Sequence, residues 1–294
     1  MRLLLGARAV LVASALAAAC APVPRPAASP GSTRSAGRVV FDQRSPVARV
    51  LVIDEGPERV MRFDALDGSD QSAIVRDRPG ALPIEYVRLA LLGLAHHGRA
   101  TRVLMVGLGG GTFTTLLHRA EPDMRIDAVE IDPVVVAAAR ACFGLREDDR
   151  YRVHVADAAD FMAKGENLYD YVLLDSYAGE EIPRALRSEA FFRDVRRRLA
   201  PDGVVAINIA ELEAEGAEVA RAFRTVLRPF DCRQAPRDGN VILFAAAGPR
   251  PPPGPAFWRW LRAWDARKIT DFSLEALAAH TGGPDCARAL GQGR

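Results

Sequence analysis

Apolar and polar residues follow two different periods along the chain, and the change falls near Thr101. From Arg38 to about Ile74, short β-rich runs such as "RVVFDQR" and "ARVLVIDEG" are separated by the turn-forming stretches "SP", "EGPE" and "DGSD". Such runs between turn signals are typical of antiparallel strands. We therefore predict a small antiparallel β domain over residues 38–80. The segment "PIEYVRLALLGLAHHG", residues 83–98, then predicts one amphipathic helix that ends at Gly98.

Beyond Thr101, apolar runs alternate with amphipathic helical patterns. Strands that alternate with helices form a parallel sheet with right-handed crossovers. The last two runs are separated by little more than "APRDGN", a hairpin signal, so an antiparallel strand is expected to close one edge. The predicted strands are 103–107, 125–130, 151–155, 169–175, 203–209, 231–235 and 240–247. This α/β pattern favours a class I methyltransferase-like (Rossmann-like), mostly parallel seven-stranded sheet, and we assign residues 81–248 to a nucleoside-binding catalytic domain.

The two ends of the chain differ in composition from the two predicted domains between them. The start, "MRLLLGARAVLVASALAAAC", has a basic beginning, a short apolar core and small residues before Cys20. This layout is typical of a secretory signal peptide over residues 1–20, and the residues before Cys20 resemble a bacterial lipoprotein cleavage box. Residues 21–37 then form a Pro/Ser-rich linker. Residues 249–294 combine a Pro-rich spacer with helices whose tryptophans we interpret as packing residues.

The N-terminal pattern predicts an exported protein, anchored to the bacterial cell envelope by a lipid on Cys20. Plain secretion and a start codon assigned too early, which would leave the protein in the cytoplasm, are the alternatives. Lys+Arg 39 against Asp+Glu 37 leaves a net charge of +2, and no element concentrates arginine with aromatic residues, so we expect no nucleic-acid partner. The cysteines show no metal-ligand spacing, and we predict no metal site.

A glycine-rich loop ends the first predicted strand of the sheet. In "VLMVGLGGGTFTTLL", Gly107 and Gly109 lie between the strand and a helix that begins near Thr112. Glycine lets the backbone turn tightly and approach a ligand closely, and the N–H groups at a helix start favour an electron-rich partner. Alone, this signal is weak.

Three carboxylates follow three further predicted strands. Glu130 ends the second strand, where a carboxylate can accept both hydroxyls of a ribose. Asp157 ends the third strand and, with the backbone of Ala158, lies at the level expected for an adenine. Asp175 ends the fourth. Because ligands bind beyond the carboxyl ends of such strands, we predict that the three carboxylates face one crevice.

From about Arg38 to Ala247, the chain resembles the spermidine/spermine synthase (polyamine aminopropyltransferase) family, in a divergent spermidine synthase-like branch. The motifs that carry the resemblance, in the family's order, are "LDGSDQS", "VLMVGLGGGT", "VEIDP", "VADAADF" and "DSYAGEEIP". The resemblance implies a transferase that moves an aminopropyl group from decarboxylated S-adenosylmethionine to a small-molecule (poly)amine, with no metal. It leaves the oligomeric state open, with a homo-oligomer as one outcome, because family members are often dimers or tetramers.

The resemblance also implies roles for individual residues. Gln71 would contact the nucleoside, and Gly107 and Gly109 would pass beneath it. Glu130 would hold the ribose, while Asp157 and Ala158 would bind the adenine. As the catalytic residue, Asp175 would bind the attacking amine and help it to lose a proton.

The chain departs from the family at the amine end of the site. Gly110 stands where the family carries an aspartate that grips the aminopropyl amine, and Ala178 replaces a second aspartate of the catalytic loop. The family's Tyr-His-Glu run before the glycine loop is missing, with "IEYVRLAL" in its place. Glu180 and Glu181 are candidates to substitute for the lost charge. Activity on putrescine is therefore in doubt.

Other functions on the same fold stay open from the sequence. An S-adenosylmethionine-dependent methyltransferase is reasonable, because glycine at position 110 removes a repulsion against the carboxylate of the intact donor. A non-catalytic nucleoside- or polyamine-binding lipoprotein is favoured by the expected export. A dehydrogenase fits Glu130, but nothing in the sequence provides hydride-transfer chemistry.

Overall fold

The computed structural model describes residues 37–177, 181–210, 214–237, 239–280 and 284–291. The signal peptide, Cys20 and the linker lie outside the described residues. Within them, no helix is long and apolar enough to cross a membrane.

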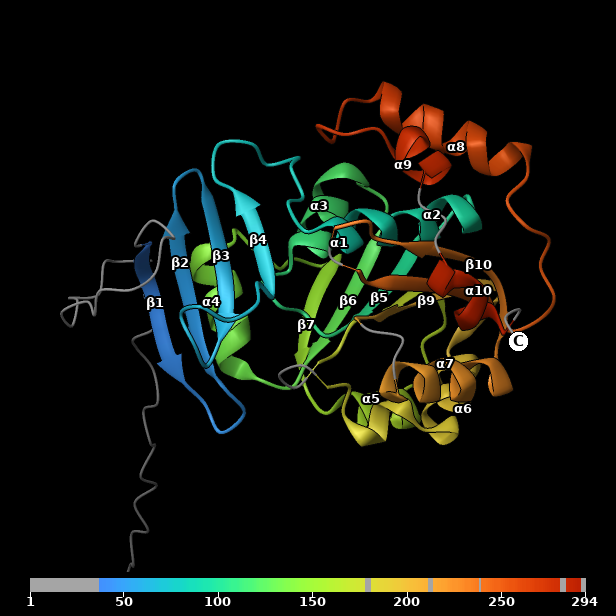
Figure 1. Ribbon diagram of the computed structural model, residues 1–294, viewed down its shortest axis with the longest axis horizontal. Helices are drawn as coiled ribbons and strands as arrows, with labels where there is room; N and C mark the ends of the chain where they lie inside the picture. The colour runs from blue at the N-terminus through green and yellow to red at the C-terminus, as the bar shows by residue number, and fades with distance from the viewer. Residues whose placement is uncertain (1–36, 178–180, 211–213, 238, 281–283, 292–294) are drawn as a thin grey trace, which may run out of the picture.

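The N-terminal unit is a four-stranded antiparallel sheet in the order β1-β2-β3-β4, as the turn-separated runs predict. Its strands are β1 (Arg38–Arg44), β2 (Arg49–Glu55), β3 (Glu58–Phe63) and β4 (Ser72–Val75). One face of the sheet packs on helix α4 (Pro133–Cys142), where Val40, Val52 and Met61 meet Val135 and Ala138 in one buried cluster. Figure 1 shows this sheet standing beside the larger one, with α4 behind it.

The second unit is a seven-stranded sheet in the order β10-β11-β9-β8-β5-β6-β7, so the predicted fold class is confirmed. Five neighbouring strands run parallel, and β11 is antiparallel to both β9 and β10. The strands are β5 (Arg102–Val106), β6 (Arg125–Glu130), β7 (Tyr151–Val155), β8 (Tyr169–Leu174), β9 (Leu199–Ile209), β10 (Arg228–Gln234) and β11 (Val241–Ala246).

Helices cover both faces of the large sheet, which explains why its central strands read as nearly continuous apolar runs. In β5, Val103 and Met105 belong to one buried cluster, and Leu104 and Val106 belong to the other. One layer contains α1 (Glu85–Ala90), α2 (Leu92–His97), α3 (Thr112–Ala120), α8 (Pro255–Ala266) and α9 (Leu274–His280); the other contains α5 (Ala158–Lys164), η1 (Arg184–Arg187), α6 (Glu189–Arg197), α7 (Ala214–Val226) and α10 (Pro284–Leu290).

The single helix predicted over residues 83–98 is wrong, because the structure divides it at Leu91 into α1 and α2. The Tyr171 hydroxyl donates a hydrogen bond of 2.7 Å to the carbonyl of Ala90. Leu94 would bond that carbonyl in a continuous helix, and instead its N–H donates to Leu91 over 3.1 Å. The predicted end is confirmed: Gly98 closes α2 in the left-handed conformation, with a φ of 84°.

Candidate active site

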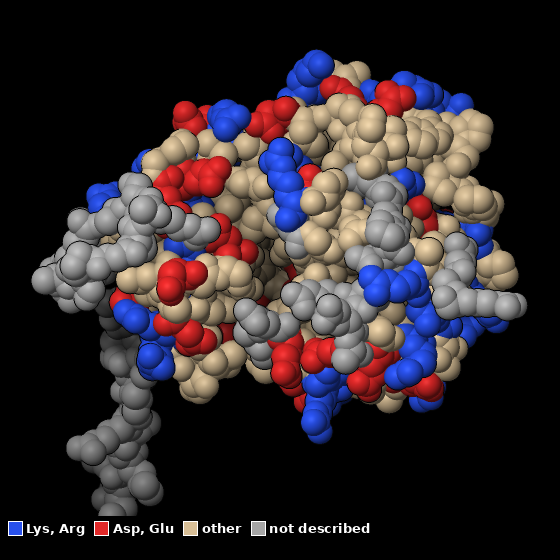
Figure 2. Space-filling model, viewed as in Figure 1, with Lys and Arg blue, Asp and Glu red and all other residues tan. Residues whose placement is uncertain are grey.

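A cavity of about 470 Å³ opens at the carboxyl ends of the parallel strands, between the large sheet and the N-terminal sheet. Its centre lies between β5 and β8, where the strand order reverses direction, which is the usual ligand site in an open α/β sheet. Figure 2 shows the molecule hollowed near its middle. All the binding and catalytic residues predicted from the sequence line this cavity: Gln71, Gly107, Gly109, Glu130, Asp157, Ala158 and Asp175.

The charge of the cavity wall is strongly one-sided. Its described lining contains no Lys, Arg or His, but carries the carboxylates of Asp64, Glu130, Asp132, Asp157 and Asp175. A concave wall that gathers one sign of charge attracts ligands of the other sign. The site is therefore suited to a cation.

The glycine-rich loop joins the first strand of the sheet to α3 and needs glycine for two separate reasons. Gly107 has a φ of +88°, and a Cβ there would lie 2.0 Å from the carbonyl oxygen of Asp175. Gly109 has a φ of +53°, and a Cβ there would meet the hydroxyl of Ser72 at 2.5 Å. The loop can thus pass closely between the backbone of Asp175 and the N-terminal sheet only without side chains at these positions.

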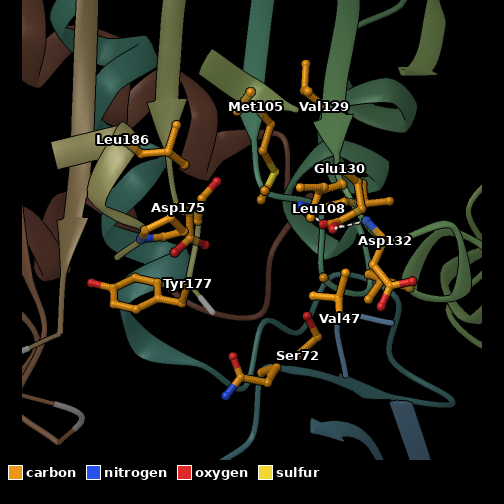
Figure 3. A pocket seen from close by; sticks show the side chains of 18 of the residues that line it. Val47, Ser72, Met105, Leu108, Val129, Glu130, Asp132, Asp175, Tyr177 and Leu186 are labelled. Carbon is orange, nitrogen blue, oxygen red and sulfur yellow. Dashed lines mark hydrogen bonds between the residues drawn. The ribbon is translucent and has the colours of Figure 1, made fainter. Parts of the chain in front are cut away.

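Glu130 is held at the end of β6 by backbone donors. The N–H of Leu108 donates to one carboxylate oxygen over 3.0 Å, and the N–H of Asp132 donates to the other over 2.9 Å. Burial raises the pKa of Glu130, and these backbone hydrogen bonds act in the opposite direction. Because each carboxylate oxygen has two lone-pair sites, the group can still accept hydroxyl donors from a ligand. Figure 3 shows Glu130 beside Leu108 and Asp132 on one side of the cavity.

Asp157 is the N-cap of α5. Its Oδ1 accepts from the N–H groups of Ala159 and Asp160 over 2.8 Å and 3.1 Å. This arrangement stabilises the start of the helix and also fixes the carboxylate at the cavity wall, next to Ala158.

Asp175 lies on the opposite side of the cavity from Glu130 (Figure 3). Asn208 donates from Nδ2 to Oδ1 of Asp175 over 2.9 Å, and Tyr86 also forms a side-chain hydrogen bond with it. Burial raises the pKa of Asp175, and the hydrogen bonds from Asn208 and Tyr86 only partly offset that rise. The result is a carboxylate that accepts a proton more readily than an exposed aspartate does.

Sequence reasoning missed three residues that build this site. Asn208, on β9, is positioned in turn by Asn240, whose Nδ2 donates to its Oδ1 over 2.9 Å. Tyr86 was missed because the family's Tyr-His-Glu run is absent here, although the tyrosine lines the cavity and forms a hydrogen bond with Asp175. Ser72, on β4, accepts a hydrogen bond of 2.7 Å from the N–H of Gly110. Only its place next to Gln71 could have indicated it.

The packing around Gly110 leaves no room for a side chain at this position, where the family carries a carboxylate. A Cβ at this position would lie 2.8 Å from the Phe143 ring and 3.0 Å from Cβ of Ser72. Ala178 and Glu180 lie outside the described residues, and Glu181 is exposed and does not line the cavity. Among the described residues, no cluster of His, Cys, Asp or Glu could hold a metal ion.

Two cysteines that the sequence left unassigned form a disulfide between Cys232 on β10 and Cys286 on α10, with a Cα–Cα distance of 5.5 Å. Cys142 is buried and is not part of this disulfide.

Comparisons with known proteins agree with the geometry. Residues 84–228 match the model of the spermine/spermidine synthase domain. A polyamine aminopropyltransferase of Vibrio vulnificus is 29% identical over 214 residues, which are 70% of this chain and 71% of that protein. For three further bacterial polyamine aminopropyltransferases, 35–37% identical, the chain covers only 60–63% of their length.

Solved structures share the fold. Spermidine synthase from Thermotoga maritima has a TM-score of 0.70 at 18% identity, over 86% of this chain and 88% of that chain. Human methyltransferase-like protein 13, in complex with SAH, has a TM-score of 0.55 at 25% identity, over 68% of this chain and 95% of that chain. Residues 84–228 of this chain therefore form a spermine/spermidine synthase domain, and the chain is similar to polyamine aminopropyltransferases.

Proposed function

We propose that the chain is an aminopropyltransferase that uses decarboxylated S-adenosylmethionine as its donor and an amine as its acceptor. The observation that carries this proposal is the cavity wall, which offers carboxylates and no basic side chain among its described residues. The decarboxylated donor carries a sulfonium and an ammonium but no carboxylate. It therefore fits this wall better than a ligand with a negative group would.

The reaction is a substitution at carbon. The lone pair of the acceptor nitrogen attacks the propyl carbon bonded to the sulfonium, and the C–S bond breaks with its electron pair moving to sulfur. Neutral methylthioadenosine leaves, and the new C–N bond leaves the nitrogen with one proton too many. Asp175 accepts that proton, and its raised pKa makes it an effective base.

The chain's own residues divide between the two ends of the cavity. Glu130, Asp157 and Ala158 would hold the nucleoside, and Gln71 would contact it from the N-terminal sheet. Asp175 would orient the amine, with Asn208 and Tyr86 fixing its carboxylate. Orienting both reactants at one place supplies most of the rate enhancement, because the sulfonium is already an activated leaving group.

The second candidate is a methyltransferase, favoured by one observation. The position that should grip the aminopropyl amine is glycine, and Phe143 and Ser72 fill the space around it. Against this candidate, the described lining contains no basic side chain for the carboxylate of intact S-adenosylmethionine. A non-catalytic nucleoside-binding role is the third outcome.

Calorimetric titration distinguishes these functions. The proposal expects decarboxylated S-adenosylmethionine and methylthioadenosine to bind, intact S-adenosylmethionine to bind more weakly, and methylthioadenosine to be released when an amine is added. Tighter binding of the intact donor, together with methyl transfer, would establish the methyltransferase.

In Glu130→Gln, the amide has one donor group where the carboxylate had an acceptor. Nucleoside affinity should fall about tenfold or more, since hydrogen bonds to a charged group contribute about 1.5–3 kcal/mol. Nucleoside binding unchanged in this variant would remove Glu130 from the ribose site.

We also propose that the protein is exported and carries a lipid on Cys20. The Cys232–Cys286 disulfide supports export, because disulfides persist in oxidising compartments. Mass spectrometry of the membrane fraction should find residues 1–19 removed and Cys20 acylated. A cytoplasmic protein that retains Met1 and reduced cysteines would contradict both proposals.

A further inference from the structure

The carboxylates of the cavity are divided unequally between its two sides. Glu130 and Asp132 lie together on one side, whereas Asp175 lies on the other with Tyr177 and Leu186 (Figure 3). Of the three carboxylates labelled there, Asp175 is thus the one on the side where the acceptor amine would bind.

The surface around Asp175 is mainly apolar. Leu173, Pro183, Ala185 and Leu186 line the cavity together with Ser176, and Leu186 lies on the same side as Asp175 (Figure 3). The Tyr177 hydroxyl is turned to the backbone, where it donates to the carbonyl of Asn208 over 3.0 Å and accepts from the N–H of Ala210 over 2.7 Å. The part of the Tyr177 side chain that can contact a ligand is therefore its ring.

Three further described acids bear on this end of the cavity. Glu181 is exposed and does not line the cavity. Glu215 forms an ion pair of 2.8 Å with Arg187, and its second oxygen accepts from the N–H of Ile182 over 2.9 Å. Asp64 lines the cavity from the N-terminal sheet, where its Oδ1 accepts from the N–H of Arg49 over 3.0 Å. Glu215 is thus neutralised by Arg187, and Asp64 belongs to the wall that the N-terminal sheet forms.

A diamine such as putrescine would bring two positive charges to this end of the cavity. One would meet Asp175, but the other would be placed against the apolar side chains that line this end. Burying an unpaired charge is strongly unfavourable, whereas burying a methyl group is favourable. The wall therefore prefers an acceptor whose second end is apolar.

We propose that the acceptor is a monoamine with an apolar chain, whose nitrogen binds Asp175 and whose chain packs on Tyr177, Pro183 and Leu186. This inference rests on the proposed aminopropyl transfer. The product would be an N-(3-aminopropyl)alkylamine, and methylthioadenosine would leave as the second product.

The test compares n-pentylamine with putrescine, which differ only in a terminal methyl group against a terminal amine. Methylthioadenosine release by the full chain, with decarboxylated S-adenosylmethionine, should give a kcat/KM at least tenfold higher for n-pentylamine. In Leu186→Glu, a carboxylate beside Asp175 should shift the ratio toward putrescine by at least tenfold. The matched control is Ala190→Glu, which adds the same charge at an exposed position of α6 outside the cavity and should leave the ratio unchanged.

The outcomes separate this inference from the proposed function. Transfer that favours putrescine in the unmodified protein would overturn the monoamine inference and keep the aminopropyltransferase. Loss of that preference in Glu180→Gln would identify the carboxylate responsible. If no amine releases methylthioadenosine, the proposed function fails, and calorimetry of both amines on the methylthioadenosine-loaded protein still tests the inference. Tighter binding of n-pentylamine would support it, and equal or tighter binding of putrescine would overturn it.

Discussion

At the scale of single residues, two aspartates on or next to β8 have opposite electrostatic situations. Burial raises the pKa of Asp175 despite its hydrogen bonds. Burial also acts to raise the pKa of Asp170, but donors from Thr101 and Arg102 outweigh it, so that pKa is lowered. The ionised form of Asp175 therefore reduces stability at neutral pH, whereas the ionised form of Asp170 increases it.

This contrast predicts opposite effects of the same substitution. Asp175→Asn should abolish transfer but raise Tm by about 2–4 °C, which corresponds to about 1 kcal/mol in a chain of this size. Asp170→Asn should lower Tm, because Thr101 and Arg102 donate to Oδ2 over 2.7–3.0 Å and hydrogen bonds to a charged group are the stronger ones. Scanning calorimetry at pH 7 measures both. The contribution of Asp170 is present above the unfolded pKa of aspartate, about 3.9, and is lost as pH falls through its lowered folded pKa. A lower Tm for Asp175→Asn would contradict the conclusion that the buried charge of Asp175 reduces stability.

Asn208 gives a pH-dependent prediction. Its hydrogen bond lowers the pKa of Asp175, so Asn208→Leu should raise that pKa further. Because the base works only when ionised, the acid limb of the kcat/KM profile should move to higher pH. Asn240→Leu releases Asn208 without removing it and should move the limb in the same direction by less. A fall in rate with an unmoved acid limb would make Asn208 merely structural.

At the scale of elements, the sequence predicts those helices and strands whose bounds are set by local patterns of apolar and polar residues. The sequence pattern predicts helices over residues 133–143 and 158–164, and the structure has α4 at Pro133–Cys142 and α5 at Ala158–Lys164. Each helix follows an aspartate whose side chain caps its start. The break at Leu91 could not be predicted, because it depends on Tyr171 reaching Ala90 from a strand far along the chain. The candidate site follows the same rule: strand-end residues were predictable, and Asn208, Tyr86 and Ser72, which act through tertiary contacts, were not.

The contact between β4 and the glycine-rich loop gives the prediction at this scale. Gly110→Asp would restore the family's carboxylate, but the side chain would have to displace Phe143 or Ser72. We expect a destabilised protein with lower, not higher, turnover, since overpacking typically costs about 1–3 kcal/mol. Gly248→Asp is the matched control, because no atom lies within 4 Å of a Cβ there, and its Tm should not change. Increased turnover in Gly110→Asp with an unchanged Tm would show that the loop adapts and that the amine site is intact.

At the scale of the whole molecule, the site depends on two sheets meeting, and neither sheet contains it alone. The N-terminal sheet supplies Gln71 and Ser72, and the large sheet supplies the carboxylates. Ser45, after β1, donates to Asp132 at the start of α4 over 2.5 Å, so the sheets are tied beside the cavity. The sequence predicted both units, but their relative placement rests on such contacts between distant residues.

The far edge of the large sheet is closed by the chain's own C-terminal helices. There α10 packs on β10, and the disulfide joins Cys286 to Cys232, with a sequence separation of 54 residues. Closing a loop of this length in the unfolded chain corresponds to about 4 kcal/mol in the chain-entropy account.

Cys286→Ala should therefore lower Tm by several degrees, and a reductant should lower the Tm of the unmodified protein toward the same value. The reductant should have no effect on Cys286→Ala, because the variant lacks the Cys232–Cys286 disulfide. Nucleoside binding should be retained in the variant, since the disulfide lies at the sheet edge and the cavity lies at the switch point between β5 and β8. An unchanged Tm under reduction would show that the edge is held by packing alone, and would remove the main structural support for folding in an oxidising compartment.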